Sequence, residues 1–155
     1  MIWPDEQTNA PANSACHQED FPGFFEIFIR SPEARTRYTA PLVRQAAITD
    51  ARLEKGTRPG SDYARFNITT VDYYYADTAS VEAWEKEPES RAYILLELAF
   101  MDLPGHRKEV RYRPALFDDE EAGGDGKRVV RYLGPAAAYQ FSWADGCWRL
   151  DTHLD

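Results

Sequence analysis

The segment YQFSWADGCWRLDTHLD (139–155) constrains the fold most, because it predicts a β-hairpin with a defined register. Asp145-Gly146 suits a two-residue type I′ turn, in which both residues have positive φ. This turn places the following residues opposite one another: Ala144 and Cys147, Trp143 and Trp148, Phe141 and Leu150, Tyr139 and Thr152. The large apolar side chains then share one face of the hairpin, so both tryptophans are predicted to be core residues rather than the rim of a binding site.

The other face of this predicted hairpin carries polar side chains, among them Asp151, His153 and Asp155. A carboxylate beside His153 would orient its imidazole. The sequence places no serine or cysteine nucleophile with them, and terminal strands fray. We interpret these three residues as a surface cluster.

The remaining segments predict short helices followed by strands. Helices are expected at 19–31, 31–39 and 78–90, from phenylalanines at helical spacing and from Ser-Pro and Pro signals at helix ends. Strands are expected at 66–76, 92–103, 107–116 and 127–133, whereas 41–56 remains ambiguous between strand and helix. This order is typical of an α+β domain with helices on one face of an antiparallel sheet. We expect a single domain, 19–155, after a flexible tail, 1–18.

Two segments resemble a known family. EDFPGFFEIFIRSPEARTRYTAPL (19–42) and the closing hairpin are similar to the two ends of secreted bacterial nuclear-transport-factor-2-like domains of unknown function. The resemblance implies a curved sheet wrapped like a cone around a pocket. Such domains include isomerases, dehydratases, ligand carriers and partner-binding proteins, so the resemblance does not imply one function.

The charge of the chain limits its partners. Its 155 residues include 26 acidic and 18 basic side chains, which give a formal net charge of -8. A surface of this sign repels phosphate groups, which argues against nucleic acids and anionic membranes and favours a basic protein partner. No apolar stretch approaches the roughly 20 residues of a membrane-spanning helix. The oligomeric state is not indicated.

The first twenty residues and the two cysteines bear on the compartment. MIWPDEQTNAPANSACHQED has no basic start and no apolar stretch, yet its polar composition resembles the segment that follows a removed signal peptide. We therefore expect a periplasmic protein, with the cytoplasm as the alternative. Cys16 and Cys147 form a disulfide in an oxidising compartment, or Cys147 packs in a strand while Cys16 stays free. Both interpretations remain open.

No known catalytic or metal motif occurs in the sequence. His17, His106 and His153 lack the spacing of a zinc site, and no nucleophile elbow, phosphate-binding loop or dinucleotide fingerprint is present. The acidic run FDDEEAGGDGK (117–127) lacks the alternating carboxylates of a calcium loop. We therefore expect no metal, no cofactor and no catalytic residues, which predicts that the protein is not an enzyme.

Glu97 is the residue that most favours a pocket. It lies in the middle of an apolar strand, on the same side as Tyr93, where an isolated carboxylate would be costly. The preferred interpretation is a structural pair with an arginine such as Arg111 or Arg113. The alternative is a general base whose pKa is raised by a pocket.

The favoured function is a non-catalytic protein-binding domain, namely a periplasmic inhibitor or immunity protein that neutralises a basic toxin or envelope enzyme. Its predicted interface consists of an acidic cluster with neighbouring aromatic side chains: Asp118, Asp119, Glu120, Glu121, Phe117 and Tyr112. One alternative is an isomerase or dehydratase with Glu97 or Asp72 as base and Tyr73, Tyr74 or Tyr75 as donor; its predicted pocket residues are Glu97, Tyr73 and Tyr93. The other alternative is a carrier of an apolar ligand.

Overall fold

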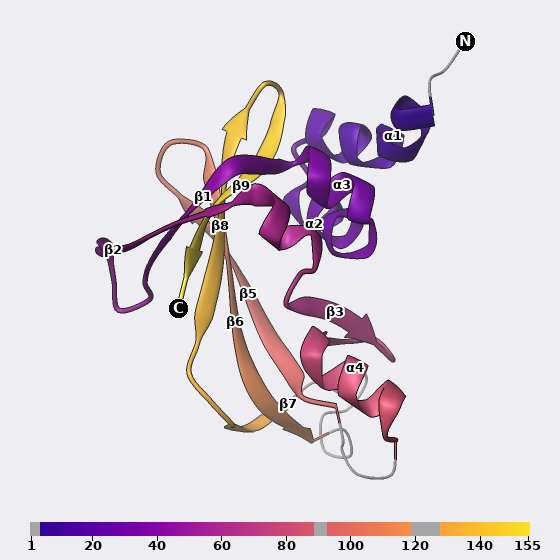
Figure 1. Ribbon diagram of the computed structural model, residues 1–155, viewed down its shortest axis with the longest axis vertical. Coiled ribbons are helices and arrows are strands. Elements are labelled where there is room, and N and C mark those ends of the chain that lie inside the picture. Colours follow the sequence, from indigo (N-terminus) through magenta and orange to yellow (C-terminus); the bar gives the residue numbers. More distant parts are fainter. Residues whose placement is uncertain (1–3, 89–92, 119–127) are drawn as a thin grey trace. The chain divides into compact units, whose positions relative to one another are not determined.

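The computed structural model describes residues 4–88, 93–118 and 128–155 (Figure 1). The helices are α1 (Pro4–His17), α2 (Phe21–Arg30), α3 (Pro32–Arg37), the 3₁₀ helix η1 (Gly60–Ala64) and α4 (Thr78–Lys86). The strands are β1 (Thr39–Ala47), β2 (Asp50–Pro59), β3 (Ile68–Val71), β4 (Tyr74–Asp77), β5 (Leu95–Leu103), β6 (Arg107–Asp118), β7 (Arg128–Tyr132), β8 (Ala137–Ala144) and β9 (Cys147–Leu154). The predicted α+β fold class is confirmed.

The chain forms two compact units, and the expectation of a single domain, 19–155, stays a prediction. Unit 1 contains Met1–Arg65, Phe100–Val110 and Ala138–Asp155, and unit 2 contains Phe66–Ala99 and Arg111–Ala137. Strands β5 and β6 contribute residues to both units. The strand order is β2-β1-β9-β8 followed by parts of β6 and β5 in unit 1; in unit 2 it is β6-β5-β4-β3, with β7 also paired to β6.

The sheet is mixed rather than purely antiparallel. Strand β1 runs parallel to β9, while its other neighbour β2 is antiparallel to it. The segment that was ambiguous from sequence, 41–56, lies within β1, β2 and the turn that joins them. Strand β2 is at the edge of the sheet and is exposed along most of its length, so its sequence lacks the alternation of a half-buried strand.

The core of unit 1 forms where α2 packs on the β8–β9 hairpin. The Asp20 carboxylate accepts a hydrogen bond from Gly23 N at 3.1 Å and caps α2, and Ser31 caps α3 in the same way. The phenylalanine stripe of α2 contacts Phe141 and Trp148, with ring centroids 5.2 Å apart for both Phe21–Trp148 and Phe28–Phe141. The predicted helices 19–31 and 31–39 are confirmed, each shorter by two residues at one end and by one residue at the other.

The predicted hairpin is confirmed near its turn and differs farther from it. Asp145 and Gly146 have φ of 55° and 81°, and Trp143 pairs with Trp148, which is 1% exposed. The register shifts between Gln140 and Phe141, however, because strand β9 contains one extra residue at this point.

This shift changes which side chains of β9 are buried. Tyr139 is opposite His153 rather than Thr152, and the two rings stack with centroids 4.4 Å apart. His153 is only 9% exposed. The predicted surface cluster of Asp151, His153 and Asp155 is therefore wrong for His153, because one extra residue moves a strand's side chains to the other face.

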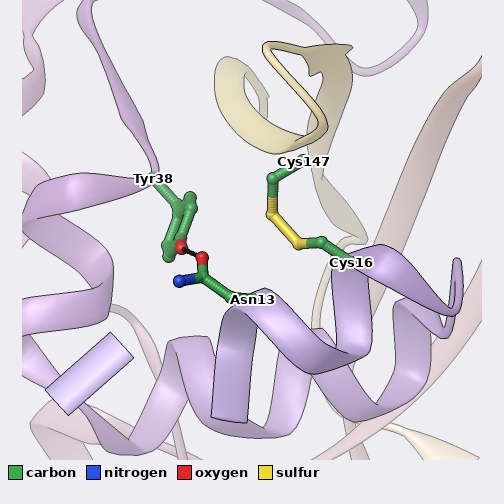
Figure 2. Close-up of a disulfide and its surroundings, with 4 residues drawn as sticks. All are labelled: Asn13, Cys16, Tyr38 and Cys147. Carbon is green, nitrogen blue, oxygen red and sulfur yellow. Dashed lines mark hydrogen bonds between the residues drawn. A yellow bond between two sulfur atoms is a disulfide. The ribbon is translucent and has the colours of Figure 1, made fainter. Parts of the chain in front are cut away.

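The segment expected to be a flexible tail contains helix α1, which belongs to unit 1. Cys16 at its end forms a disulfide with Cys147 at the start of β9, and their Cα atoms lie 5.0 Å apart (Figure 2). Tyr38 donates a hydrogen bond from Oη to Asn13 Oδ1 at 2.5 Å (Figure 2). Of the two interpretations of the cysteines, the structure contains the disulfide. The disulfide thus attaches to the hairpin a segment whose composition is typical of a flexible tail.

Unit 2 consists of α4 and the strands around it. The Asp77 carboxylate caps α4 by accepting a hydrogen bond from Ser80 N at 3.0 Å. Strands β3 and β4 form a hairpin whose turn residues, Asp72 and Tyr73, both have positive φ. No described helix is long and apolar enough to cross a membrane.

Candidate functional site

A cavity of about 190 Å³ lies in unit 2 beside Glu97. It is lined by side chains from β5, β6 and β7 and from the segment before β8: Glu97, Ala99, Arg111, Tyr112, Arg113, Tyr132 and Ala136. Its volume is below the roughly 300–1,000 Å³ of typical ligand sites, so it suits a small molecule. Three of the lining side chains are charged, and two more, Tyr112 and Tyr132, are phenols.

The strand period explains why these charged groups meet. Successive side chains of a strand point to opposite faces, so Glu97 and Ala99 share the face of β5 that is opposite to the buried Leu96. On β6, Arg111 and Arg113 are likewise two residues apart and both line the cavity. Glu97 therefore faces a group of polar side chains, while its neighbour Leu96 faces the apolar interior.

Tyr132 is the hydrogen-bond partner of Glu97. Strand β7 pairs with β6 so that Tyr132 is opposite Ala115, and Leu133 N donates to Pro114 O at 2.9 Å. In this position Tyr132 Oη donates a hydrogen bond to Glu97 Oε1 at 2.7 Å. This hydrogen bond, supported by partial burial and by the carboxylate charge, raises the pKa of Tyr132 above its ordinary value. The phenol therefore remains protonated and acts as a donor.

Two contacts position the guanidinium group of Arg113. Its Nε donates a hydrogen bond to Gly134 O at 2.9 Å, and its Cζ lies 4.0 Å from the centroid of the Tyr132 ring. Such stacking of a guanidinium on an aromatic face is a cation–π contact. The sequence-based interpretation paired Glu97 with Arg111 or Arg113. In the structure both arginines line the Glu97 cavity, and the direct hydrogen bond comes from Tyr132.

The other predicted pocket residues lie elsewhere in unit 2. Tyr73 is in the β3–β4 turn and is 93% exposed. Tyr93 packs against Trp84 of α4, with ring centroids 4.9 Å apart. Neither residue lines the Glu97 cavity. The positive φ at the turn directs the chain away from the strand geometry that would have placed Tyr73 beside β5.

The residues of the predicted partner interface are only partly described. Tyr112 lines the Glu97 cavity, and Phe117 packs against Tyr74 with centroids 5.3 Å apart. Asp118 ends β6 opposite Arg128. The other three acidic residues lie outside the described residues: Asp119, Glu120 and Glu121.

The sequence analysis did not identify Tyr132 as a site residue, although it named Glu97, Arg111 and Arg113. The segment KRVVRYL predicted a strand, but nothing in it indicated which strand is its partner. The β6–β7 pairing brings Tyr132 next to Arg113, nineteen positions away in the sequence, and also next to Glu97, which is 35 positions away. An aromatic residue at the end of an arginine-containing strand was the only local signal.

Unit 1 contains a chain of polar contacts that is structural in character. Gln140 Nε2 donates to the buried Glu109 at 2.9 Å, and Arg107 donates to Gln140 Oε1 at 2.8 Å and to Ser142 Oγ at 3.2 Å. Ser142 Oγ in turn donates to Asp151 Oδ2 at 2.6 Å. These contacts give hydrogen-bond partners to the almost fully buried Gln140 and to Oε1 of the almost fully buried Glu109.

Unit 1 also contains a cavity of about 300 Å³, which is lined by Thr36, Thr39, Ala40, Pro41, Gly60, Ser61 and Ala64. None of these residues titrates near neutral pH, so this cavity offers no acid–base pair. Within the described ranges, no group of three or more His, Cys, Asp or Glu side chains is arranged to hold a metal.

The comparisons with known proteins give a distant structural likeness. No family model and no curated protein matches the chain. A solved structure from Pseudomonas putida, named a "putative polyketide cyclase", is 11% identical over 99% of this chain and 90% of its own, with a TM-score of 0.29. A "putative dehydratase from the NTF2-like family" of Streptomyces avermitilis is 12% identical over 96% of this chain and 89% of its own, with a TM-score of 0.22.

These comparisons correct one prediction. Both names designate enzymes, so the prediction that the chain is not an enzyme is withdrawn, although the names describe those proteins and not this chain. The interpretation as an inhibitor or immunity protein gains no support from them. The second name includes the family label that the sequence resemblance had suggested. TM-scores of this size assign neither a reaction nor a ligand to this chain.

Proposed function

We propose that the cavity in unit 2 binds a small molecule and transfers a proton within it, with Glu97 as the base. The observation that carries this proposal is the 2.7 Å hydrogen bond from Tyr132 Oη to Glu97 Oε1 at the wall of a cavity that two arginines also line. A carboxylate, a protonated phenol and guanidinium groups are the side chains that an isomerase or dehydratase without a cofactor requires.

The hydrogen bond assigns different tasks to the two oxygens of Glu97. Oε1 accepts the phenol proton of Tyr132, which fixes the orientation of the carboxylate. Oε2 remains as the acceptor for a proton from the ligand. Tyr132 is therefore a positioning residue, and its raised pKa keeps it a donor while Glu97 exchanges protons.

The expected reaction begins at a C–H bond next to a carbonyl group. Glu97 Oε2 takes this proton, and the electron pair of the broken C–H bond moves into the carbonyl to form an enolate. The guanidinium groups of Arg111 and Arg113 offset the developing negative charge. Return of the proton to the same carbon regenerates the ligand; in a ligand with a β,γ double bond, return of the proton to the γ carbon shifts that double bond and completes an isomerisation that needs no further reagent.

The lining of the cavity favours this reaction over simple carriage of an apolar ligand. Glu97, Arg111 and Arg113 contribute three charges to a volume of about 190 Å³. An apolar ligand would remove water from these charges without replacing its hydrogen bonds, which is costly. The carrier interpretation is therefore the less favoured one.

Hydrogen–deuterium exchange tests the proposal. The wild-type protein in D₂O should accelerate the loss of the C–H NMR signal of 2-oxobutyrate at C3, and Glu97→Gln should slow this exchange by about 10²–10⁴-fold. Glu85→Gln, an exposed change on α4, is the matched control and should exchange at the wild-type rate. An exchange rate equal to that in buffer, or one unchanged by Glu97→Gln, would refute the proposal.

We also propose an exported location, which remains a prediction. The Cys16–Cys147 disulfide supports it, because disulfides persist mainly in oxidising compartments. Alkylation of free thiols immediately after lysis of the native host measures the state of both cysteines. Two free thiols in the native host would contradict the proposal.

A further inference from the structure

We propose that the ligand of the Glu97 cavity is a short oxo acid whose carboxylate is bound by Arg113. This inference rests on the proposed function, since it concerns the same cavity. Among the described residues, the charged side chains of the lining are two arginines and one glutamate. The whole chain has a formal charge of -8, so two arginines in one small cavity are a local exception to its acidic character.

The geometry of Arg113 prepares it for a carboxylate. The hydrogen bond to Gly134 O uses Nε, and Cζ lies over the Tyr132 ring. These two contacts restrict the position of the guanidinium group, while the terminal nitrogens Nη1 and Nη2 are outside the bond to Gly134. A planar pair of N–H donors matches the two oxygens of a carboxylate, and fixing the group beforehand reduces the entropy lost on binding.

Tyr132 sets the distance between the two functional ends of the cavity. Its ring contacts the Arg113 guanidinium, while its hydroxyl contacts the Glu97 carboxylate. A ligand that reaches both groups must therefore extend from the centre of the Tyr132 ring to its hydroxyl group. A carboxylate at the Arg113 end and a carbonyl with an acidic C–H at the Glu97 end satisfy both groups, as in a short oxo acid.

Glu97 would repel an anion, and the arrangement compensates for this. Its Oε1 already accepts a hydrogen bond from Tyr132, and the positive charge of Arg113 lies over the same phenol ring. The ligand's carboxylate is then placed at Arg113, over the centre of the ring rather than at its hydroxyl group. The repulsion then selects the orientation in which the uncharged carbonyl end lies near the base.

Binding of an unreactive pair of probes tests the inference. Propionate and propionamide have nearly the same shape, but only propionate is charged. We expect propionate to bind wild-type protein at least about tenfold more tightly in an NMR titration, which is equivalent to about 1.4 kcal/mol. Arg113→Gln should remove this preference, and Arg113→Lys should keep part of it because the charge remains.

The matched control is Arg131→Gln. Arg131 is exposed on β7 next to Tyr132 and does not line the cavity, so this change removes the same charge from the same part of unit 2. It should leave the preference for propionate unchanged. Equal affinity for the two probes, no binding of propionate, or the same loss in Arg131→Gln would each overturn the inference. The comparison of the two probes on the wild-type protein does not depend on the folding of any variant.

Proton exchange and propionate binding together distinguish a failure of this inference from a failure of the proposed function. If 2-butanone exchanges its C–H protons as fast as 2-oxobutyrate and Glu97→Gln stops both, the base is right and the carboxylate preference is wrong. If propionate binds through Arg113 but no carbonyl compound exchanges protons, the anion site is right and the proposed reaction is wrong.

Discussion

Replacement of Cys16 and Cys147 by alanine removes the covalent link between α1 and the β8–β9 hairpin. The disulfide joins residues 131 positions apart. In the chain-entropy model, a loop of this length restricts the unfolded chain by an amount worth about 5 kcal/mol at 25 °C. Since small proteins are stable by only about 5–15 kcal/mol, the double variant should be strongly destabilised.

Without the disulfide, the other described contacts of α1 contribute little to holding this helix on unit 1. The buried side chains described for α1 are small, namely Ala12, Ala15 and Cys16, and Pro11 lies inside the helix. The described side chains of α1, from residue 11 onward, bury few apolar atoms, so their hydrophobic contribution is small. Without the disulfide, α1 should open locally while the core around α2 remains folded.

Urea unfolding and amide hydrogen exchange measure the two effects. We expect the free energy of unfolding to fall by about 3–5 kcal/mol, because measured losses are often below the chain-entropy value. Cys16→Ala, Cys147→Ala and the double variant should lose nearly the same amount, because each breaks the same bond. Exchange in α1 should become faster than in α2. A loss below about 1 kcal/mol, or additive losses in the two single variants, would refute the reasoning.

Three further predictions concern single side chains. Trp148→Ala should lower the free energy of unfolding by about 3–5 kcal/mol in urea, because the ring is 1% exposed and packs on α2; a loss below about 0.5 kcal/mol would contradict this. Burial lowers the pKa of His153, so the unfolded state binds a proton first on acidification, and stability should fall as the pH drops through about 6.5. His153→Gln should lose that part of the dependence in urea unfolding curves recorded across this pH range, and an unchanged slope would argue against it. Glu97→Gln should lower the pKa of Tyr132, measured as phenolate absorbance relative to Tyr132→Phe; an unchanged titration would mean that the hydrogen bond is absent in solution.

Local chemistry explains which elements were predictable. The Asp145-Gly146 turn, the phenylalanine stripe of α2 and the Ser31 cap depend on residues within a few positions of one another. Such signals are present in the sequence itself, so the hairpin near its turn and the first helices after α1 were predicted correctly. The same reasoning predicted that Glu97, which lies in an apolar strand, requires polar side chains beside it.

Only the tertiary structure decided features that join distant segments. The extra residue in β9, which moves His153 into the interior, has no local sequence signal. The attachment of α1 to the hairpin uses Cys147, 131 positions away, which no local pattern in α1 indicates. The meeting of Glu97 with Tyr132 requires the pairing of β6 with β7 and cannot be read from either strand alone. The sequence by itself determined the turns, caps and apolar faces, because these follow from neighbouring residues. Strand pairing determined the site, because it brings together side chains that no local pattern connects.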